Sequence, residues 1–255
     1  MDIFFSHSAG RMTNTDWQYS PVYATFDHTE WDWAAAHGWL INEWEPPYWF
    51  QGRQVRLDLK VKPKKRHKYP PDLHFHVGPV ESLHRLKRVW KEYKKKRSYD
   101  DHLDFEQTCA YEPENKRIVR VYRNGKIIAF SILRIYPIPV SLQFAWDYDE
   151  PKLSVGIHTQ NFEINYFRKI GYRYDYMCPG YETACIWKSR FPGFQFWTGT
   201  RWTDDKELYE KLCERDSTLA NLDDLGDLDD IDDDPAKSGI ASGNSTWSGI
   251  SPRPY

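Results

Sequence analysis

The segment Arg117-Ile-Val-Arg-Val-Tyr-Arg-Asn-Gly-Lys-Ile-Ile-Ala-Phe-Ser-Ile-Leu-Arg-Ile-Tyr136 decides the fold, because Asn124-Gly125 separates two runs rich in β-forming residues. Asn-Gly readily takes the two positive φ angles of a type I′ turn, the turn that joins paired antiparallel strands. β-branched and aromatic residues fill both runs, which is typical of strands. We therefore predict an antiparallel hairpin over residues 117–136.

The residues that follow the hairpin predict more strands around one helix. Pro137 and Pro139 interrupt the chain, and residues 141–147 are expected to form a third strand. Beyond the helix, short strands are expected at 172–177, 194–197 and 200–202. The order β-β-β-α-β predicts an α/β (α+β) fold with a mixed sheet flanked by helices.

The helix itself is expected over residues 154–170, because apolar residues recur there near one stripe of a helical surface. These residues are Ile157, Ile164, Phe167 and Ile170. Gly171 then stands where a helix end favours a residue that can take a positive φ. A last short helix is expected to begin at Asp204, with Glu207 completing a capping box.

Before the hairpin, the pattern predicts a helix over 30–38, a strand over 48–59 and a longer helix over 80–96. The longer helix has an apolar stripe under a strongly basic face. A basic loop, 60–71, punctuated by proline, separates the strand from this helix.

Charge is distributed unevenly along the chain although the net charge is only −2. The segment 53–97 contains 16 Lys or Arg against 4 Asp or Glu, whereas 204–234 contains 14 acidic residues against 3 basic ones. A basic segment favours a polyanionic partner such as nucleic acid, and an acidic tail can compete with that partner. Alternatively, both segments are only solvated surfaces. Residues 216–255 lack enough apolar side chains to form a core, so we expect a disordered acidic tail.

Several classes of protein are disfavoured by the composition. No apolar run approaches the roughly 18 residues that a membrane span needs, and the first residues lack the pattern of a signal peptide. The four cysteines show no C-x-x-C spacing, which favours reduced thiols over a disulfide framework or a structural metal. We expect a soluble cytoplasmic protein that has no membrane contact and no bound metal.

Five motifs, in order, resemble those of arginyl-tRNA-protein transferases and their bacterial leucyl-transferring relatives. They are Trp33-Ala-Ala-Ala-His-Gly-Trp39, Val89-Trp-Lys-Glu-Tyr93, the hairpin 121–129, Ser154/Gly156 with Gly171/Tyr174, and Trp187/Lys188/Phe191. The resemblance spans residues 20–203 and implies a GNAT-type acyltransferase fold built from two related halves. The halves would be 1–110, which contains the basic loop and helix, and 111–215, which contains the acyltransferase motifs; the tail is then 216–255.

The resemblance implies an enzyme that moves an aminoacyl group from a charged tRNA to the α-amine of a protein or peptide. The chain departs from the family twice. No cysteine precedes Cys109, so the N-terminal cysteine cluster of arginyl transferases is absent. Residues 175–181 replace the family's usual hydrophobic stretch, which leaves the transferred amino acid open.

Such a transfer needs few chemical groups, because the aminoacyl ester is already activated. It requires positioning, a stabilised oxyanion and removal of one proton, but no ATP, metal, cofactor or covalent nucleophile. Glu163 and Asp175 are the carboxylates expected to take part in catalysis, since one lies on the predicted helix and the other on the next strand. Alternatively, either is an ordinary surface or hydrogen-bonding carboxylate.

Ser154 and Gly156 mark the start of the predicted helix, where free amides and the helix dipole favour an anion. Acetyltransferases place the coenzyme A pyrophosphate there on a longer glycine-rich loop, which this chain lacks. We therefore expect a terminal phosphate of a tRNA CCA end at this position. The alternative is an ordinary helix cap and a packing glycine.

Lys188 is expected to face a phosphate or the oxyanion while Trp187 stacks on a terminal adenine. Alternatively, Trp187 belongs to the core and Lys188 extends from it to solvent. Further basic residues are expected to contact the phosphates of the acceptor stem. They are Lys64, Lys65, Arg66, Arg88, Lys91 and Arg97.

Two other functions stay open at this stage. One is a GNAT N-acyltransferase that uses a coenzyme A thioester. The other is a non-catalytic relative that binds nucleic acid or a protein partner.

Overall fold

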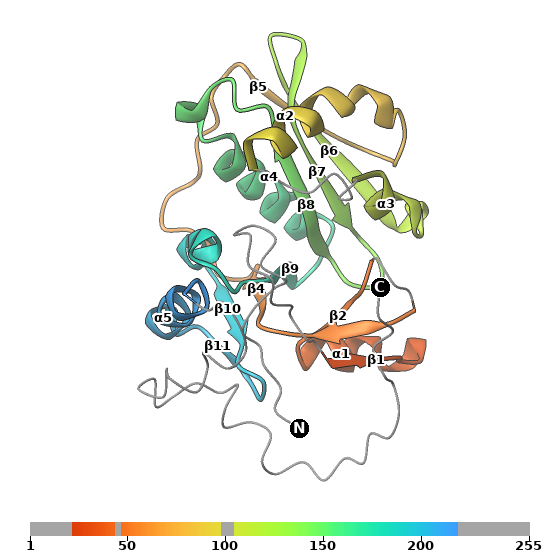
Figure 1. Cartoon of the computed structure of the whole chain (residues 1–255), viewed down its shortest axis with the longest axis vertical. Coiled ribbons are helices and arrows are strands. Elements are labelled where there is room, and N and C mark those ends of the chain that lie inside the picture. The colour runs from red at the N-terminus through yellow and green to blue at the C-terminus, as the bar shows by residue number, and fades with distance from the viewer. Residues whose placement is uncertain (1–21, 44–46, 98–104, 219–255) are drawn as a thin grey trace.

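The computed structural model describes residues 22–43, 47–97 and 105–218, and its main feature is an eight-stranded mixed sheet (Figure 1). The strand order is β11-β10-β4-β9-β8-β7-β6-β5. Within the described residues, β8 and β9 are parallel and every other neighbouring pair is antiparallel. The strands are β4 (Gln54–Asp58), β5 (Leu73–Gly78), β6 (Lys116–Arg123), β7 (Lys126–Arg134), β8 (Val140–Trp146), β9 (Tyr174–Pro179), β10 (Phe194–Trp197) and β11 (Trp202–Thr203).

Helices cover both faces of the sheet. One face carries α4 (Val155–Lys169), α5 (Lys206–Asp216) and the 3-10 helix η5 (Thr183–Arg190), which contribute to one apolar cluster. The other face carries α2 (Lys87–Arg97) and α3 (Phe105–Ala110) over β6, β7 and β8. The expected mixed sheet flanked by helices is therefore confirmed. Its β6-β7-β8-α4-β9 order agrees with the GNAT-type fold that the family resemblance implies.

A second, three-stranded sheet packs against the main one. Its strands, in the order β1-β3-β2, are β1 (Val22–Ala24), β3 (Trp49–Gln51) and β2 (Trp39–Ile41), and α1 (Trp31–Ala36) precedes β2. Leu40 and Trp49 form a cluster with Val140 and Tyr176 of the main sheet. The Tyr176 hydroxyl also donates to the carbonyl of Ala35, at 3.3 Å. This sheet therefore covers the face of β9 opposite α4.

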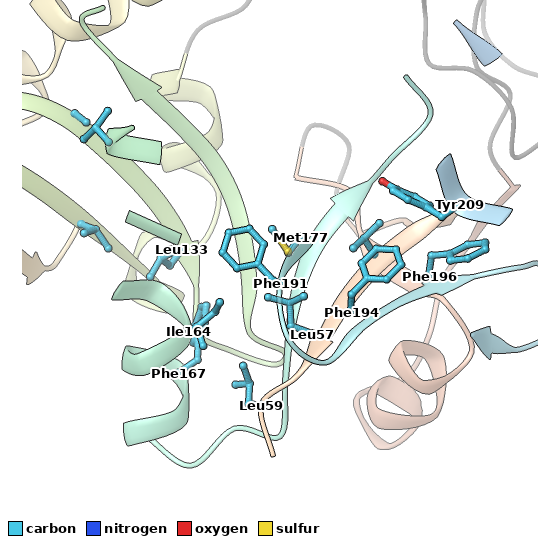
Figure 2. Close-up of a cluster of buried hydrophobic side chains, with 14 of the residues drawn as sticks. Leu57, Leu59, Leu133, Ile164, Phe167, Met177, Phe191, Phe194, Phe196 and Tyr209 are labelled. Atoms are coloured by element: carbon cyan, nitrogen blue, oxygen red, sulfur yellow. The ribbon is translucent and has the colours of Figure 1, made fainter. Parts of the chain in front are cut away.

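The largest apolar cluster lies under α4 and α5 (Figure 2). Ile164 and Phe167 of α4 join Leu133 of β7, and Tyr209 of α5 joins Phe194 of β10 in the same cluster. Phe167 and Tyr209 have no exposed surface. Truncating such a buried aromatic side chain to alanine costs about 3–5 kcal/mol, so this cluster contributes much of the stability.

Local sequence signals predicted the elements after residue 116 well. Asn124 and Gly125 have φ angles of 49° and 75°, so the turn of the predicted hairpin is confirmed. Gly171 follows α4 with a φ of 94°. The last helix begins one residue later than expected, because Asp205, and not Asp204, accepts the cap hydrogen bond from the amide of Leu208.

Other expectations were wrong in detail. The strand expected over 48–59 is two strands, β3 and β4, which belong to different sheets. The helix expected from residue 80 begins only at Lys87, because Ser82 takes a left-handed conformation and a 3-10 turn, Leu83–Arg85, comes first. Ile157 and Ile170 are 37% and 44% exposed, so only half of the predicted stripe of α4 is buried.

The proposed division at residue 110 stays a prediction. Strands from both sides of that position alternate in the main sheet, since β4 lies between β9 and β10. At the other boundary, Asp216 is buried and forms an ion pair with Arg53 at 2.5 Å. Asp216 therefore belongs to the folded body, whereas the acidic run after Thr218 lies outside the described residues.

Among the helices that the structure describes, none combines the length and the apolar character needed to cross a membrane.

Candidate active site between strands β8 and β9

The two parallel strands β8 and β9 pair at a single position, Val140 with Tyr176. Both strands are bulged directly beyond it. On β8, Ser141 and Gln143 pair with consecutive residues of β7, which leaves Leu142 as the extra residue. On β9, Tyr176 and Pro179 pair with Arg56 and Gln54 of β4, so β9 also has an extra residue. Bulges bend a strand and end its pairing, and we call the space between the diverging strands the β8–β9 wedge.

The exposure of β8 agrees with this geometry. β8 is a central strand, yet Ser141, Leu142, Gln143 and Phe144 are all half-buried. A central strand with neighbours on both sides is normally buried along its length. The wedge therefore leaves part of the middle of the sheet accessible.

Ser141 lies where the two strands begin to separate and contacts two carboxyl groups. Its hydroxyl is 2.8 Å from Oε2 of Glu163 on α4 and 3.1 Å from Oδ1 of Asp175 on β9. The side-chain amide of Gln160, one turn before Glu163, donates to the other oxygen of Asp175 at 3.0 Å. Four polar side chains from three elements thus form one buried hydrogen-bonded cluster.

Burial shifts the titration of both carboxyls. Glu163 is 2% exposed, and the loss of hydration raises its pKa to about 7, although hydrogen bonds from Ser131 and Ser141 act in the opposite direction. Asp175 has no exposed surface, and burial together with the nearby Glu163 charge raises its pKa well above the usual range. The pair therefore retains a proton near neutral pH and can exchange it there.

The two carboxyls that sequence reasoning selected, Glu163 and Asp175, lie together in the structure, but the groups that join them were missed. The sequence pattern places Ser141 only on a strand and Gln160 only on a helix. A signal for Gln160 exists in its spacing, because it lies three residues before Glu163 and so shares a helix face with it. No local signal identifies Ser141, since its orientation depends on the bulge at Leu142.

Lys188 lies on η5 and is 7% exposed. Its ammonium group donates to the carbonyl oxygens of Met177, Cys178 and Pro179, at 2.8, 3.3 and 2.7 Å. An ammonium group has three protons, so three consecutive carbonyls of β9 engage all of them. A role for Lys188 at a phosphate or an oxyanion stays a prediction.

Trp187 is half-buried and packs against the main apolar cluster. Its ring meets that of Phe191 edge to face, with centroids 5.8 Å apart. Stacking of Trp187 on an adenine also stays a prediction.

At the start of α4, Ser154 takes a left-handed conformation with a φ of 53°, and its side chain makes no cap hydrogen bond. Gly156 lies against a ring of β8, because a Cβ added to it would be 3.3 Å from Phe144. This close approach accounts for the glycine by packing. Binding of an anion at Ser154 and Gly156 is not excluded by the contact and stays a prediction.

A cavity of about 180 Å³ lies beside this helix start. Trp146, Leu153 and Val155 contribute apolar surface to it. Its charged residues are Arg123, Lys126, Asp147, Asp149 and Glu150. Ion pairs join them, including Lys126 to Asp149 at 2.9 Å and Arg123 to Glu150. Three carboxylates in one small cavity make it a poor site for a diphosphate.

The basic residues predicted to bind tRNA do not form one surface. Lys64, Lys65 and Arg66 are exposed on the loop between β4 and β5. His67, next to them, contacts His158 of α4 with ring nitrogens 2.7 Å apart, which holds this loop against α4. The other predicted residues lie on α2, across the sheet from α4: they are Arg88, Lys91 and Arg97. Arg88 forms an ion pair with the buried Asp147 at 3.0 Å.

Two other chemistries find little support in the described residues. In that part of the chain, no three His, Cys, Asp or Glu side chains gather as metal ligands. Burial raises the pKa of the Cys178 thiol, which is at the edge of the wedge, to about 11. A thiol with such a pKa is a weak nucleophile at neutral pH, because the thiolate is the reactive form.

No family model and no curated protein matches the sequence. Similar solved structures include the C-terminal domain of a protein described as a lysylphosphatidylglycerol synthetase from Agrobacterium fabrum, with a TM-score of 0.39 and 15% identity over 51% of this chain and 46% of that one. A GCN5-related N-acetyltransferase from Kribbella flavida has a TM-score of 0.35 and 10% identity over 50% and 48%. A functionally unknown conserved protein from Staphylococcus epidermidis has a TM-score of 0.32 and 10% identity over 60% and 57%. The matched part is about half the length of these structures, and similarity this low carries no argument about activity.

Proposed function

We propose that this protein transfers an aminoacyl group from a charged tRNA to the α-amine of a protein or peptide. The observation that carries the proposal is the position of Ser141, which lies at the opening of the β8–β9 wedge and contacts Glu163, a buried carboxyl with a pKa of about 7. A group with this pKa can accept a proton at neutral pH and return it within the same reaction cycle.

The reaction requires such a group once per cycle. The amine nitrogen attacks the ester carbonyl, a C–N bond forms, and the C–O bond to the tRNA ribose breaks. The amine loses one proton, which passes through the Ser141 hydroxyl to Glu163 and then to the departing ribose oxygen. A peptide α-amine has a pKa of about 7.7–8.0, so a base of moderate strength is sufficient.

Asp175 has a supporting part in this scheme. Its protonated carboxyl, held by Gln160, keeps negative charge low beside Glu163 and orients the Ser141 hydroxyl. Two carboxyls this close cannot both ionise without a large electrostatic cost. The pair is therefore suited to hold one charge and to pass on one proton.

The choice of donor rests on charge. Lys64, Lys65 and Arg66 extend into solvent from a loop that packs on α4, the helix of Glu163, and provide phosphate contacts on that side of the sheet. The cytosol, where charged tRNAs are found, would be the site of action.

Coenzyme A is the second candidate donor, favoured by the cavity beside the start of α4. The carboxylates of Asp147, Asp149 and Glu150 in that cavity act against its diphosphate, so we rank it lower. A non-catalytic binding role ranks third, because a buried pair of carboxyls is expensive to retain without a use.

An assay of amino acid transfer tests the proposal. A panel of charged tRNAs with radiolabelled amino acids is incubated with the protein and a peptide that has a free N-terminus, without ATP. We expect label in the peptide, abolished by ribonuclease and reduced in Glu163→Gln. Label from acyl-coenzyme A alone would favour the second candidate. Binding of tRNA without any transfer would favour the third.

A further inference from the structure

The C-terminal end of β9 has an irregular backbone. Cys178 takes a left-handed conformation with a φ of 58°, which residues with a side chain rarely adopt. The register against β4 shifts at the same place, between the pairs Arg56–Tyr176 and Gln54–Pro179. The carbonyls of Met177 and Cys178 lie in this irregular stretch. Such groups need other partners, since an unpaired buried carbonyl is destabilising.

Lys188 supplies those partners. Its three bonds to the carbonyls of residues 177, 178 and 179 span the whole irregular stretch. The helix that carries Lys188 is itself fixed, because the neighbouring Ser189 hydroxyl contacts Glu210 of α5 at 3.0 Å. The ammonium group is therefore held at a set place between the body of α5 and the end of β9.

We propose that Lys188 is a positioning residue that holds β9 in its bulged form and thereby keeps the β8–β9 wedge open. Without the ammonium group, Met177 and Cys178 would have no charged donor to stabilise the left-handed turn. The end of β9 would then lose its fixed distance from β8. The structural part of this proposal stands by itself; its consequence for acyl transfer rests on the proposed function.

The Cys178 thiol reports on this region directly. Its sulfur lies 3.7 Å from the carbonyl oxygen of Ser141, across the wedge, and it is half-buried. The positive charge of Lys188 lowers the pKa of this thiol, although burial raises it more. If Lys188 acted only through its charge, removing it would reduce the thiolate fraction and slow alkylation. If Lys188 holds the backbone, removing it frees the turn and speeds alkylation.

The test is alkylation of the folded protein by iodoacetamide, with each cysteine followed by peptide mass spectrometry. We expect Lys188→Met to raise the rate at Cys178 by at least about tenfold, because loss of charged hydrogen bonds increases local opening to that extent. Cys109 and Cys213, which are 1% and 0% exposed, should keep their rates and so report on global unfolding. Lys211→Met, which removes an exposed lysine on α5, is the matched control and should leave Cys178 unchanged.

A second variant covers the case in which Lys188→Met does not fold and all four cysteines react together. Lys188→Gln retains a neutral donor of two protons, so we expect it to fold and to give a rate at Cys178 between those of the wild type and the fully exposed thiol. An unchanged or slower rate at Cys178 in the folded variant would overturn the proposal. Since no substrate is present, this result does not depend on whether acyl transfer occurs.

Discussion

Glu163 and Asp175 contact the same hydroxyl, that of Ser141, at 2.8 and 3.1 Å, although they lie on different elements. A hydroxyl has one proton to donate. Both contacts are full hydrogen bonds only if one carboxyl is itself protonated and donates to the serine oxygen. The raised pKa values of both groups agree with this arrangement.

The pH dependence of stability should report the buried Glu163. Its pKa rises from 4.5 to about 7 on folding, so the folded state binds the proton more tightly. The stabilisation is fully present below pH 4.5 and is lost as the pH rises toward 7, a fall of about 3 kcal/mol in the free energy of unfolding. Asp175 shifts in the same direction. Urea unfolding across this range should show the decline.

Glu163→Gln replaces the protonated carboxyl by a neutral amide of similar shape. We expect this variant to be more stable than the wild type at pH 8 and to show a flatter stability profile between pH 4.5 and 7. Glu114→Gln, which changes an exposed glutamate, is the control and should retain the wild-type slope. A wild-type slope in Glu163→Gln as well would mean that Glu163 is not the group responsible.

Removing the shared hydroxyl should affect transfer more than stability. Ser141→Ala breaks the connection between the wedge and Glu163, and we expect transfer to fall by about 10²-fold or more, as for other losses in a proton path. The free energy of unfolding should fall by only about 1–3 kcal/mol. Ser131→Ala is a matched control, because the Ser131 hydroxyl donates to the carbonyl of Gln143 and lies off the proposed path. Equal losses in both variants would remove Ser141 from the mechanism.

The basic loop on α4 should contribute more to tRNA binding than α2 does. Alanine at Lys64, Lys65 and Arg66 together should weaken binding and reduce the slope of log K against log salt by about 0.7–0.9 for each phosphate that the variant no longer binds. The control is a triple alanine variant on the opposite face. It changes Lys91, Lys95 and Lys96, which are exposed on α2. A larger loss of affinity from the α2 variant would place the tRNA on that face instead.

The C-terminal boundary can be tested by two changes. A chain that ends at Thr218 should keep the wild-type melting temperature, because the contacts of Asp216 and Ser217 are retained. Asp216→Asn, in contrast, leaves the buried Arg53 without its carboxylate partner and should cost about 3–5 kcal/mol. Calorimetry of both proteins decides the point, and a neutral effect of Asp216→Asn would show that the ion pair adds no stability.

The parts of the fold that could be predicted are those specified by nearby residues. Asn124-Gly125 determines its own turn, and the Gly171 position ends α4 with a positive φ. The strands of the small sheet have three residues each, too few for an alternating pattern to appear. Gly52 and Arg53 separate β3 from β4, and nothing local announces that the two strands join different sheets.

The candidate site shows the same limit. Glu163 and Asp175 could be selected because each is a carboxylate on an element next to the expected acyl site. Their burial could not be foreseen, since the stripe of α4 that faces the sheet contains Thr159, Gln160 and Glu163 beside its apolar residues. The role of Lys188 at three carbonyls depends on the β9 bulge, which arises from pairing with the distant β4.

The central claim is that Glu163 accepts the proton of the acceptor amine, and the ratio of wild-type to Glu163→Gln transfer rates across pH tests it most directly. The titration of the acceptor amine affects both proteins and cancels in this ratio. We predict a ratio that rises about tenfold per pH unit below 7 and levels off above it, following the pKa of about 7. A ratio that stays constant from pH 5 to 9 would contradict the account.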